Sequence, residues 1–129
     1  MNYAMLKTIC VTKDYLDQNR LEVKKLVRKY LQMLGLGNKY FSKTMWQLEN
    51  GLAFIFGNNA GYMVVDLPQL WPHENTAIIT QYYNMTQTDL DDVLKVLKQS
   101  GKDAVLFQAH QDMDMPGWKR GPRIYSKVL

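Results

Sequence analysis

An amphipathic helix near the beginning of the chain constrains the fold more than any other feature of the sequence. From Asp14 to Leu34, apolar residues recur at steps of three, four and seven, which is the spacing of one helix face. Gly35 follows and can supply the left-handed residue at which many helices end. The apolar residues of this stripe are Leu16, Val23, Val27, Tyr30, Leu31 and Leu34. We therefore expect a long helix that buries one face.

Most of the remaining chain alternates between turns and segments typical of β-strands, which are rich in β-branched and apolar residues. We expect strands over residues 5–12, 62–67, 76–83 and 103–109. A second helix is predicted from Asp89 to Gln99, with Thr88 as its N-cap. Its acidic residues come first and its lysines last, which is the order that the helix dipole favours.

The dipeptide Asn50-Gly51 predicts a two-residue β-hairpin between strands at 44–49 and 52–56. The turn type of such a hairpin needs positive φ at both central residues, and Asn and Gly tolerate it best. Both faces of this hairpin would carry large apolar side chains, unlike a sheet with one face in water. We therefore expect a helix, the C-terminal tail or a partner to cover its second face.

These elements predict a single α+β domain over residues 1–129. The expected order is β-α-β-β-β-β-α-β, with an antiparallel sheet, two helices packed on it and an irregular, basic C-terminal tail. A chain of 129 residues suits one domain. A hydrophobic fraction of 47% and a charged fraction of 22% are typical of globular proteins.

The sequence predicts a cytoplasmic protein without a membrane span or a disulfide. No apolar stretch approaches the roughly 18–20 residues that cross a bilayer. The first seven residues lack the basic and then apolar layout of a signal peptide. The single cysteine, Cys10, lies in an apolar run, where a buried and inert thiol is the expected role.

Charge is segregated along the chain. Residues 1–43 carry a net charge of +6, and residues 95–129 carry +4. Residues 44–94 contain six acidic residues and no Lys or Arg. Such a chain can fold into a molecule with opposed charged faces, which steer association and select partners. The alternative is that the segments interleave in the fold and neutralise one another.

The chain contains no motif that predicts catalysis or a cofactor. The one local cluster of candidate metal ligands is His110, Asp112 and Asp114, whose alternating positions would share a side if extended. This spacing is not a known metal signature, and a polar surface loop explains it better. We therefore expect no metal site, no cofactor and no enzymatic activity.

The C-terminal tail is basic and aromatic, and Gly and Pro interrupt it. Its cations can neutralise phosphates and its rings can stack on unpaired bases. A nucleic-acid surface would then comprise Arg20, Lys24 and Arg28 of the first helix with Trp118, Lys119, Arg120 and Arg123 of the tail. In the alternative interpretation, the tail's aromatic residues pack it onto the sheet.

Aromatic residues in loops and at strand ends indicate a protein interface, because interfaces are enriched in Tyr, Trp, Met and Arg. Tyr82 and Tyr83 are adjacent in a strand, so they point to opposite faces and one of them is expected to be exposed. The expected partner-binding residues are Trp71, Tyr82, Tyr83, Trp118, Lys119, Arg120, Arg123 and Tyr125.

We rank three candidate functions by how well they agree with these observations. The first is a non-enzymatic protein-binding module, an inhibitor or adaptor of the type that phages and other mobile elements encode, for example one that blocks a host defence nuclease by surface occlusion. The second is a protein that binds single-stranded nucleic acid. The third, a small metal-dependent enzyme built on His110, Asp112 and Asp114, is the weakest.

Overall fold

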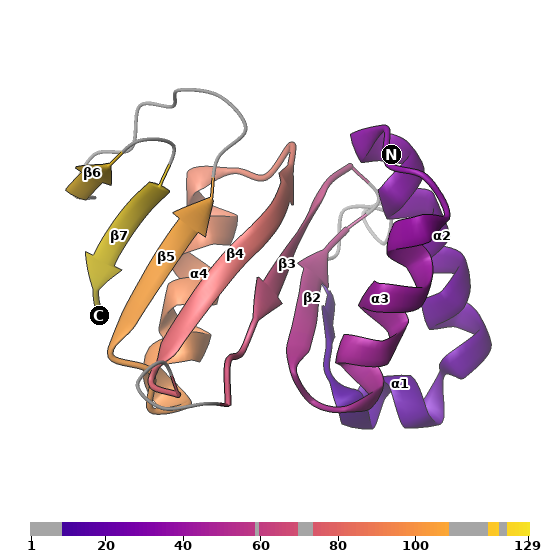
Figure 1. Ribbon diagram of the computed structural model, residues 1–129, viewed down its shortest axis with the longest axis horizontal. Coiled ribbons are helices and arrows are strands. Elements are labelled where there is room, and N and C mark those ends of the chain that lie inside the picture. The colour runs from indigo at the N-terminus through magenta and orange to yellow at the C-terminus, as the bar shows by residue number, and fades with distance from the viewer. Residues whose placement is uncertain (1–8, 59, 70–73, 109–118, 122–123) are drawn as a thin grey trace.

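The computed structural model describes residues 9–58, 60–69, 74–108, 119–121 and 124–129 of the chain (Figure 1). These residues form an α+β fold in which helices cover both faces of one sheet. In chain order the elements are β1 (Ile9–Val11), α1 (Lys13–Gln18), α2 (Arg20–Leu34), α3 (Lys39–Glu49), β2 (Ala53–Gly57), β3 (Tyr62–Asp66), β4 (Thr76–Tyr83), α4 (Gln87–Gln99), β5 (Ala104–Gln108), β6 (Lys119–Gly121) and β7 (Ile124–Val128).

The sheet is mostly antiparallel, with one parallel pair at its centre. Its strand order is β1-β2-β3-β4-β5-β7-β6 within the described residues. Strands β2, β3 and β4 form an antiparallel meander, and each lies in a segment for which the sequence predicts a strand. Strand β5 pairs parallel with β4, because α4 carries the chain back across the sheet between them. The expected antiparallel sheet is therefore confirmed in the main, and the parallel pairing of β4 with β5 is the exception.

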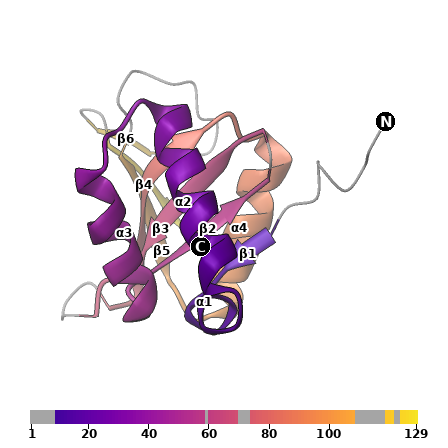
Figure 2. The ribbon, with the colours of Figure 1, turned by 90° about the vertical axis from the view of Figure 1, so that its right-hand side faces the viewer.

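Two apolar cores lie on opposite faces of the sheet, and alternate residues of β2 point into each. Ala53 and Ile55 pack with α1, α2 and α3, whereas Phe54 and Phe56 pack with α4. Figure 2 shows α3 and α4 on opposite sides of the strands. Every residue of β2 is buried, so the prediction that both faces of this strand are covered is confirmed. Full burial of a Phe or Ile side chain contributes about 1.5–3 kcal/mol to the free energy of unfolding.

The predicted helix from Asp14 to Leu34 forms as two helices, α1 and α2, which meet at Asn19. The amide side chain of Asn19 donates a hydrogen bond to the carbonyl of Tyr15 at 3.1 Å. Asn competes for backbone groups in this way, which explains why it interrupts helices. The expected ending is confirmed, because Gly35 adopts a left-handed conformation with φ of 76°.

The predicted hairpin at Asn50-Gly51 is wrong, because residues 44–49 belong to helix α3. Asn50 has φ of −99° and Gly51 has φ of +68°, so only the glycine is left-handed. The amide of Gly51 donates to the carbonyl of Leu48, and that of Leu52 donates to Gln47. This pair of bonds is the Schellman ending of a helix, which uses the same residue types as a hairpin turn.

The second predicted helix forms as α4, but its N-cap is Thr86 and not Thr88. The Thr86 hydroxyl accepts a hydrogen bond from the amide of Asp89 at 3.1 Å, and the Asp89 carboxylate accepts one from the amide of Thr86 at 3.0 Å. This reciprocal capping box fixes the start of the helix. The fold thus contains four helices in its described part, where the sequence predicted two.

The tail is partly regular, which corrects the expectation that it is irregular. Strand β7 pairs antiparallel with β5, and β6 pairs with β7 at the edge of the sheet. The N-terminal strand is described only as Ile9–Val11, and the earlier part of its predicted range lies outside the described residues. Among the described residues, no helix is long and apolar enough to cross a membrane.

Candidate functional site

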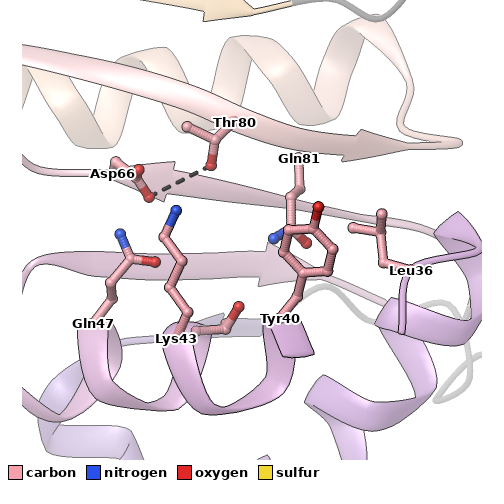
Figure 3. A pocket seen from close by; sticks show the side chains of 8 residues that line it. Leu36, Tyr40, Lys43, Gln47, Asp66, Thr80 and Gln81 are labelled. Atoms are coloured by element: carbon pink, nitrogen blue, oxygen red, sulfur yellow. Dashed lines mark hydrogen bonds between the residues drawn. The ribbon is translucent and has the colours of Figure 1, made fainter. Parts of the chain in front are cut away.

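A polar pocket of about 210 Å³ lies between helix α3 and the face of strands β3 and β4 (Figure 3). We call it the α3–β4 pocket. Leu36 and Tyr40 lie on one side of it with Gln81 beside the Tyr40 ring, and Lys43, Gln47 and Asp66 lie toward the other side. The polar residues that line it are Lys43, Thr44, Gln47, Asp66, Thr80 and Gln81.

A β-bulge in strand β4 shapes this pocket. Val64 of β3 pairs with Gln81, and Val65 pairs with Ile79, so Thr80 is an extra residue without a partner in the ladder. Neighbouring residues of a regular strand point to opposite faces. The bulge allows Thr80 and Gln81 to line the same pocket. Bulges occur often beside functional sites, where they redirect a side chain in this way.

Asp66, at the end of β3, is a half-buried carboxyl group facing the pocket. Burial raises its pKa above the usual value, and this outweighs the opposing effects of hydrogen bonds from Gln47 and Thr80 and of the charge on Lys43. The Thr80 hydroxyl lies 3.4 Å from the Asp66 carboxylate. The pocket therefore holds an acidic group whose charge its own surroundings only partly compensate.

Gln81 has a fixed orientation because its side-chain oxygen accepts a hydrogen bond from the Tyr62 hydroxyl at 2.9 Å. The amide nitrogen of Gln81 is then left as a donor on the pocket side (Figure 3). Tyr62 is buried and stacks on Tyr30, with ring centroids 4.5 Å apart. Burial also raises the pKa of Tyr30 to about 12 and that of Tyr62 further. The hydroxyl of Tyr62 is therefore a neutral hydrogen-bond donor at physiological pH.

A larger and more open groove of about 560 Å³ adjoins the α3–β4 pocket. The two cavities share Gln47 and Asp66, which stand at their boundary. The groove is mainly apolar, and its other lining residues are Leu52, Leu67, Pro68, Gln69 and Ile78. A ligand in the pocket could extend into this groove.

The outer surface of helices α1, α2 and α3 forms a second candidate site. Leu21 of α2 is 74% exposed and Trp46 of α3 is 56% exposed. The ion pair between Arg20 and Glu49, 2.6 Å apart, joins the beginning of α2 to the end of α3, and Leu21 and Trp46 lie near these ends in sequence. We call the surface around Leu21 and Trp46 the docking surface. Large apolar side chains in water are characteristic of binding sites when they occur together.

The docking surface belongs to a layer with excess positive charge. Residues 13–49, which form the three helices, contain eight Lys and Arg and four Asp and Glu, a net charge of +4. Helix α4 on the opposite face contains three Asp and two Lys, a net charge of −1. The segregation of charge along the chain is kept only in part, because α1–α3 and α4 cover different faces of the sheet but Glu49 of the acidic segment pairs with Arg20 of the basic one.

The predicted partner-binding residues are not gathered into one described site. Tyr83 is 37% exposed, whereas Tyr82 packs its ring edge against Phe107, 5.1 Å away between centroids, and donates a hydrogen bond to the Met85 carbonyl. This agrees with the prediction that one of the two tyrosines is exposed. Trp71, Trp118 and Arg123, together with the candidate metal ligands His110, Asp112 and Asp114, lie outside the described residues. Of Lys119, Arg120 and Tyr125, only the backbone positions on β6 and β7 are described.

Two of the three basic residues predicted on the first helix already have partners within the chain. Arg20 forms ion pairs with Glu49 and, at 3.8 Å, with Asp17. The guanidinium group of Arg28 lies 4.4 Å from the centre of the Phe41 ring. These contacts compete with phosphate binding, and of the three only Lys24 forms no ion pair or ring contact among the described residues. These contacts reduce the positive charge that the predicted nucleic-acid surface can offer to phosphates.

The N-terminus of α4 offers little to an anionic ligand. It follows a parallel strand, a position that often binds phosphate groups in α/β proteins. Here the Asp89 carboxylate accepts hydrogen bonds from the amide and hydroxyl of Thr86 at 3.0 and 2.8 Å. The negative charge of Asp89 in the first turn would therefore repel a phosphate group at this helix end. Asn84 precedes this helix and adopts a left-handed conformation with φ of 50°. Its side-chain amide donates a hydrogen bond to the carbonyl of Ala60, which joins the loop before α4 to the loop between β2 and β3.

The α3–β4 pocket was missed because its residues come from four separate segments. The sequence predicts a strand over residues 44–49, so the helix face that Lys43 shares with Gln47 is not recognised from it. The bulge at Thr80 leaves no mark in a sequence that otherwise reads as a regular strand. The four-residue spacing of Lys43 and Gln47 was the one available signal. Among the described residues, no group of His, Cys, Asp or Glu could hold a metal ion.

Comparison with known proteins identifies a shared fold and no family. No family model matches the chain, and no curated protein matches its sequence significantly. Among solved structures, the chain is similar to GCN5 from Tetrahymena, with a TM-score of 0.57 and 11% sequence identity over 95% of each chain. At that identity, the likeness shows that the two proteins share a fold over nearly their whole lengths.

Proposed function

We propose that this chain is a non-enzymatic protein-binding module, an inhibitor or adaptor that acts by occupying the surface of a partner. The observation that carries the proposal is the exposure of Leu21 on α2 and of Trp46 on α3, two helices of one positively charged layer. Tryptophan is among the residues that most often dominate binding energy at interfaces. The surrounding charge favours a partner whose surface is acidic.

The capped and negatively charged N-terminus of α4 also favours a binding role over a reaction that uses a phosphate-bearing cofactor. The capping box engages the amides of Thr86 and Asp89, and the carboxylate of Asp89 adds a negative charge at the same helix end. The carboxylate-lined face of a metal-dependent host defence nuclease is the concrete partner that suits a basic docking surface. A protein encoded by a phage or another mobile element would block such an enzyme by occlusion.

The test compares variants for capture of one partner from lysate of the native cell. Tagged wild-type protein is expected to retain a stoichiometric, nuclease-resistant protein partner, and Trp46→Ala and Leu21→Ala are each expected to weaken its binding by about tenfold or more. Val128→Ala is the matched control, because Val128 is 84% exposed on β7 and lies away from α2 and α3. Equal partner binding by all four proteins would contradict the proposal.

A second candidate function is acetyl transfer to an amine, and the bulged α3–β4 pocket favours it. GCN5, which shares the fold, is an acetyltransferase. Asp66, whose pKa burial raises, would accept a proton from the amine. The amine nitrogen would form a bond to the carbonyl carbon of an acetyl thioester, the C–S bond would break, and the thiolate would leave. The carboxylate of Asp89 at the N-terminus of α4 disfavours the phosphates of coenzyme A there, and this places acetyl transfer second.

The second candidate is tested by incubating the protein with acetyl-coenzyme A and a panel of amines while released thiol is measured. Activity that Asp66→Asn abolishes, in a variant that remains folded, would establish a transferase and displace the first proposal. No thiol release above the protein-free rate would leave the binding role as the function that the geometry favours.

A further inference from the structure

We propose that the α3–β4 pocket binds a small zwitterion, a molecule of amino-acid size that carries one ammonium and one carboxylate group. The site is made by Lys43 of α3, Asp66 at the end of β3, and Thr80 and Gln81 at the bulge of β4. It shares no residue with the docking surface. The inference is independent of the docking surface, and it would name the amine substrate of the α3–β4 pocket if the second proposed function is correct.

The two charges of the pocket select the class of ligand. Asp66 and Lys43 both line the cavity, and the charge of Lys43 is close enough to affect the pKa of Asp66. None of the ion pairs among the described residues joins them. A ligand with only a positive charge would be repelled by Lys43, and one with only a negative charge would be repelled by Asp66. A zwitterion can pair with both groups at once.

The neutral groups of the pocket fit the same ligand. The oxygen of Gln81 is held by Tyr62, so its amide nitrogen can donate to a carboxylate beside Lys43. Thr80 and Gln47 bond the Asp66 carboxylate and hold it in place for an ammonium group. Leu36 and the ring of Tyr40 provide an apolar wall for an aliphatic side chain (Figure 3).

The size of the cavity limits the ligand further. Its volume of about 210 Å³ is below the roughly 300–1,000 Å³ of pockets that hold drug-sized molecules. It corresponds to about seven water molecules at roughly 30 Å³ each. An amino acid with a medium aliphatic side chain occupies a comparable space, and a longer one could reach the adjoining apolar groove.

The experiment titrates the full chain by calorimetry with three probes that share one aliphatic tail. L-Leucine carries both charges, 3-methylbutylamine lacks the carboxylate, and 4-methylpentanoate lacks the ammonium group. We expect L-leucine to bind, and each singly charged analogue to bind at least about tenfold more weakly, because each loses a charge-assisted contact. Absence of L-leucine binding, or equal binding of either analogue, would overturn the proposal.

Variants test the assigned residues. Asp66→Asn and Lys43→Gln are each expected to weaken L-leucine binding by about tenfold or more. Lys25→Gln is the matched control, because Lys25 is exposed on α2 and does not line the pocket. Circular dichroism verifies that each variant is folded, and Thr80→Val provides a second test on β4 if Asp66→Asn does not fold. Unchanged binding in the folded pocket variants would assign the ligand to another site.

Discussion

The hydroxyl of Tyr62 donates a hydrogen bond to the side-chain oxygen of Gln81 across the pairing of β3 with β4, over 2.9 Å. Tyr62 belongs to the core beneath α2, where it stacks on Tyr30. Gln81 belongs to the lining of the α3–β4 pocket. One contact thus links the packing of the core to the orientation of a pocket donor.

Removal of that hydroxyl is expected to affect both the core and the pocket. Tyr62→Phe keeps the ring and its stacking but removes the donor, so the free energy of unfolding should fall by about 1 kcal/mol. L-Leucine binding should weaken as well, because the Gln81 amide loses its fixed orientation. Urea denaturation and calorimetry measure the two effects. Tyr83→Phe, at an exposed tyrosine, should change neither quantity.

Replacement of Asp66 by Asn should change stability in a pH-dependent manner. Burial raises the pKa of Asp66 in the folded state, so the stability that its protonated form contributes is fully present below the unfolded pKa of about 3.9. That contribution is lost as the pH rises through the folded pKa. Asp66→Asn should therefore be more stable than wild type at pH 7 and not at pH 4.

Urea denaturation of both proteins at pH 4 and pH 7 measures this difference. Asp92→Asn, at an exposed position of α4, serves as the control and should show no comparable gain at pH 7. A larger gain for Asp66→Asn at pH 4 than at pH 7 would show that burial does not destabilise the ionised carboxyl.

A methyl group at Gly61 should destabilise the fold because the backbone of the next strand leaves no room for it. A Cβ atom at this position would collide with the backbone carbonyl oxygens of Tyr83 and Asn84. Gly61→Ala should lower the free energy of unfolding by about 1–3 kcal/mol or more. Gly37→Ala is the matched control, since a Cβ there meets nothing within 4 Å, and its effect should stay within about 0.5 kcal/mol. Thermal denaturation of both variants tests the pair.

The capping box of α4 predicts a contrast between two neighbouring threonines. Thr86→Ala removes the side chain that caps the helix and should cost about 1 kcal/mol of stability. Thr88→Ala lies inside the first turn, where Ala is the better helix former, and should be neutral or slightly stabilising. Chemical denaturation that ranks the two variants in the reverse order would contradict the assigned N-cap.

The sequence predicted much of the fold but not the pocket, and particular residues show why. The stripe from Leu16 to Leu34 and the strands of the meander follow local periodicity, which the chain carries in each segment. Asn50-Gly51 was misinterpreted because a left-handed glycine serves both a hairpin turn and a helix ending. Only the hydrogen bonds from Gly51 and Leu52 to the preceding turn distinguish the two.

By itself, the sequence determined the α+β class, the order of its main strands and the burial of both faces of β2, because these depend on residues close together in the chain. The tertiary structure alone decided that β5 pairs parallel with β4, that the positive and acidic helices cover different faces, and that Lys43, Asp66 and Gln81 meet in one pocket. These relations join distant segments, and the bulge at Thr80 exists only where two strands are paired. No pattern confined to one segment specifies such contacts.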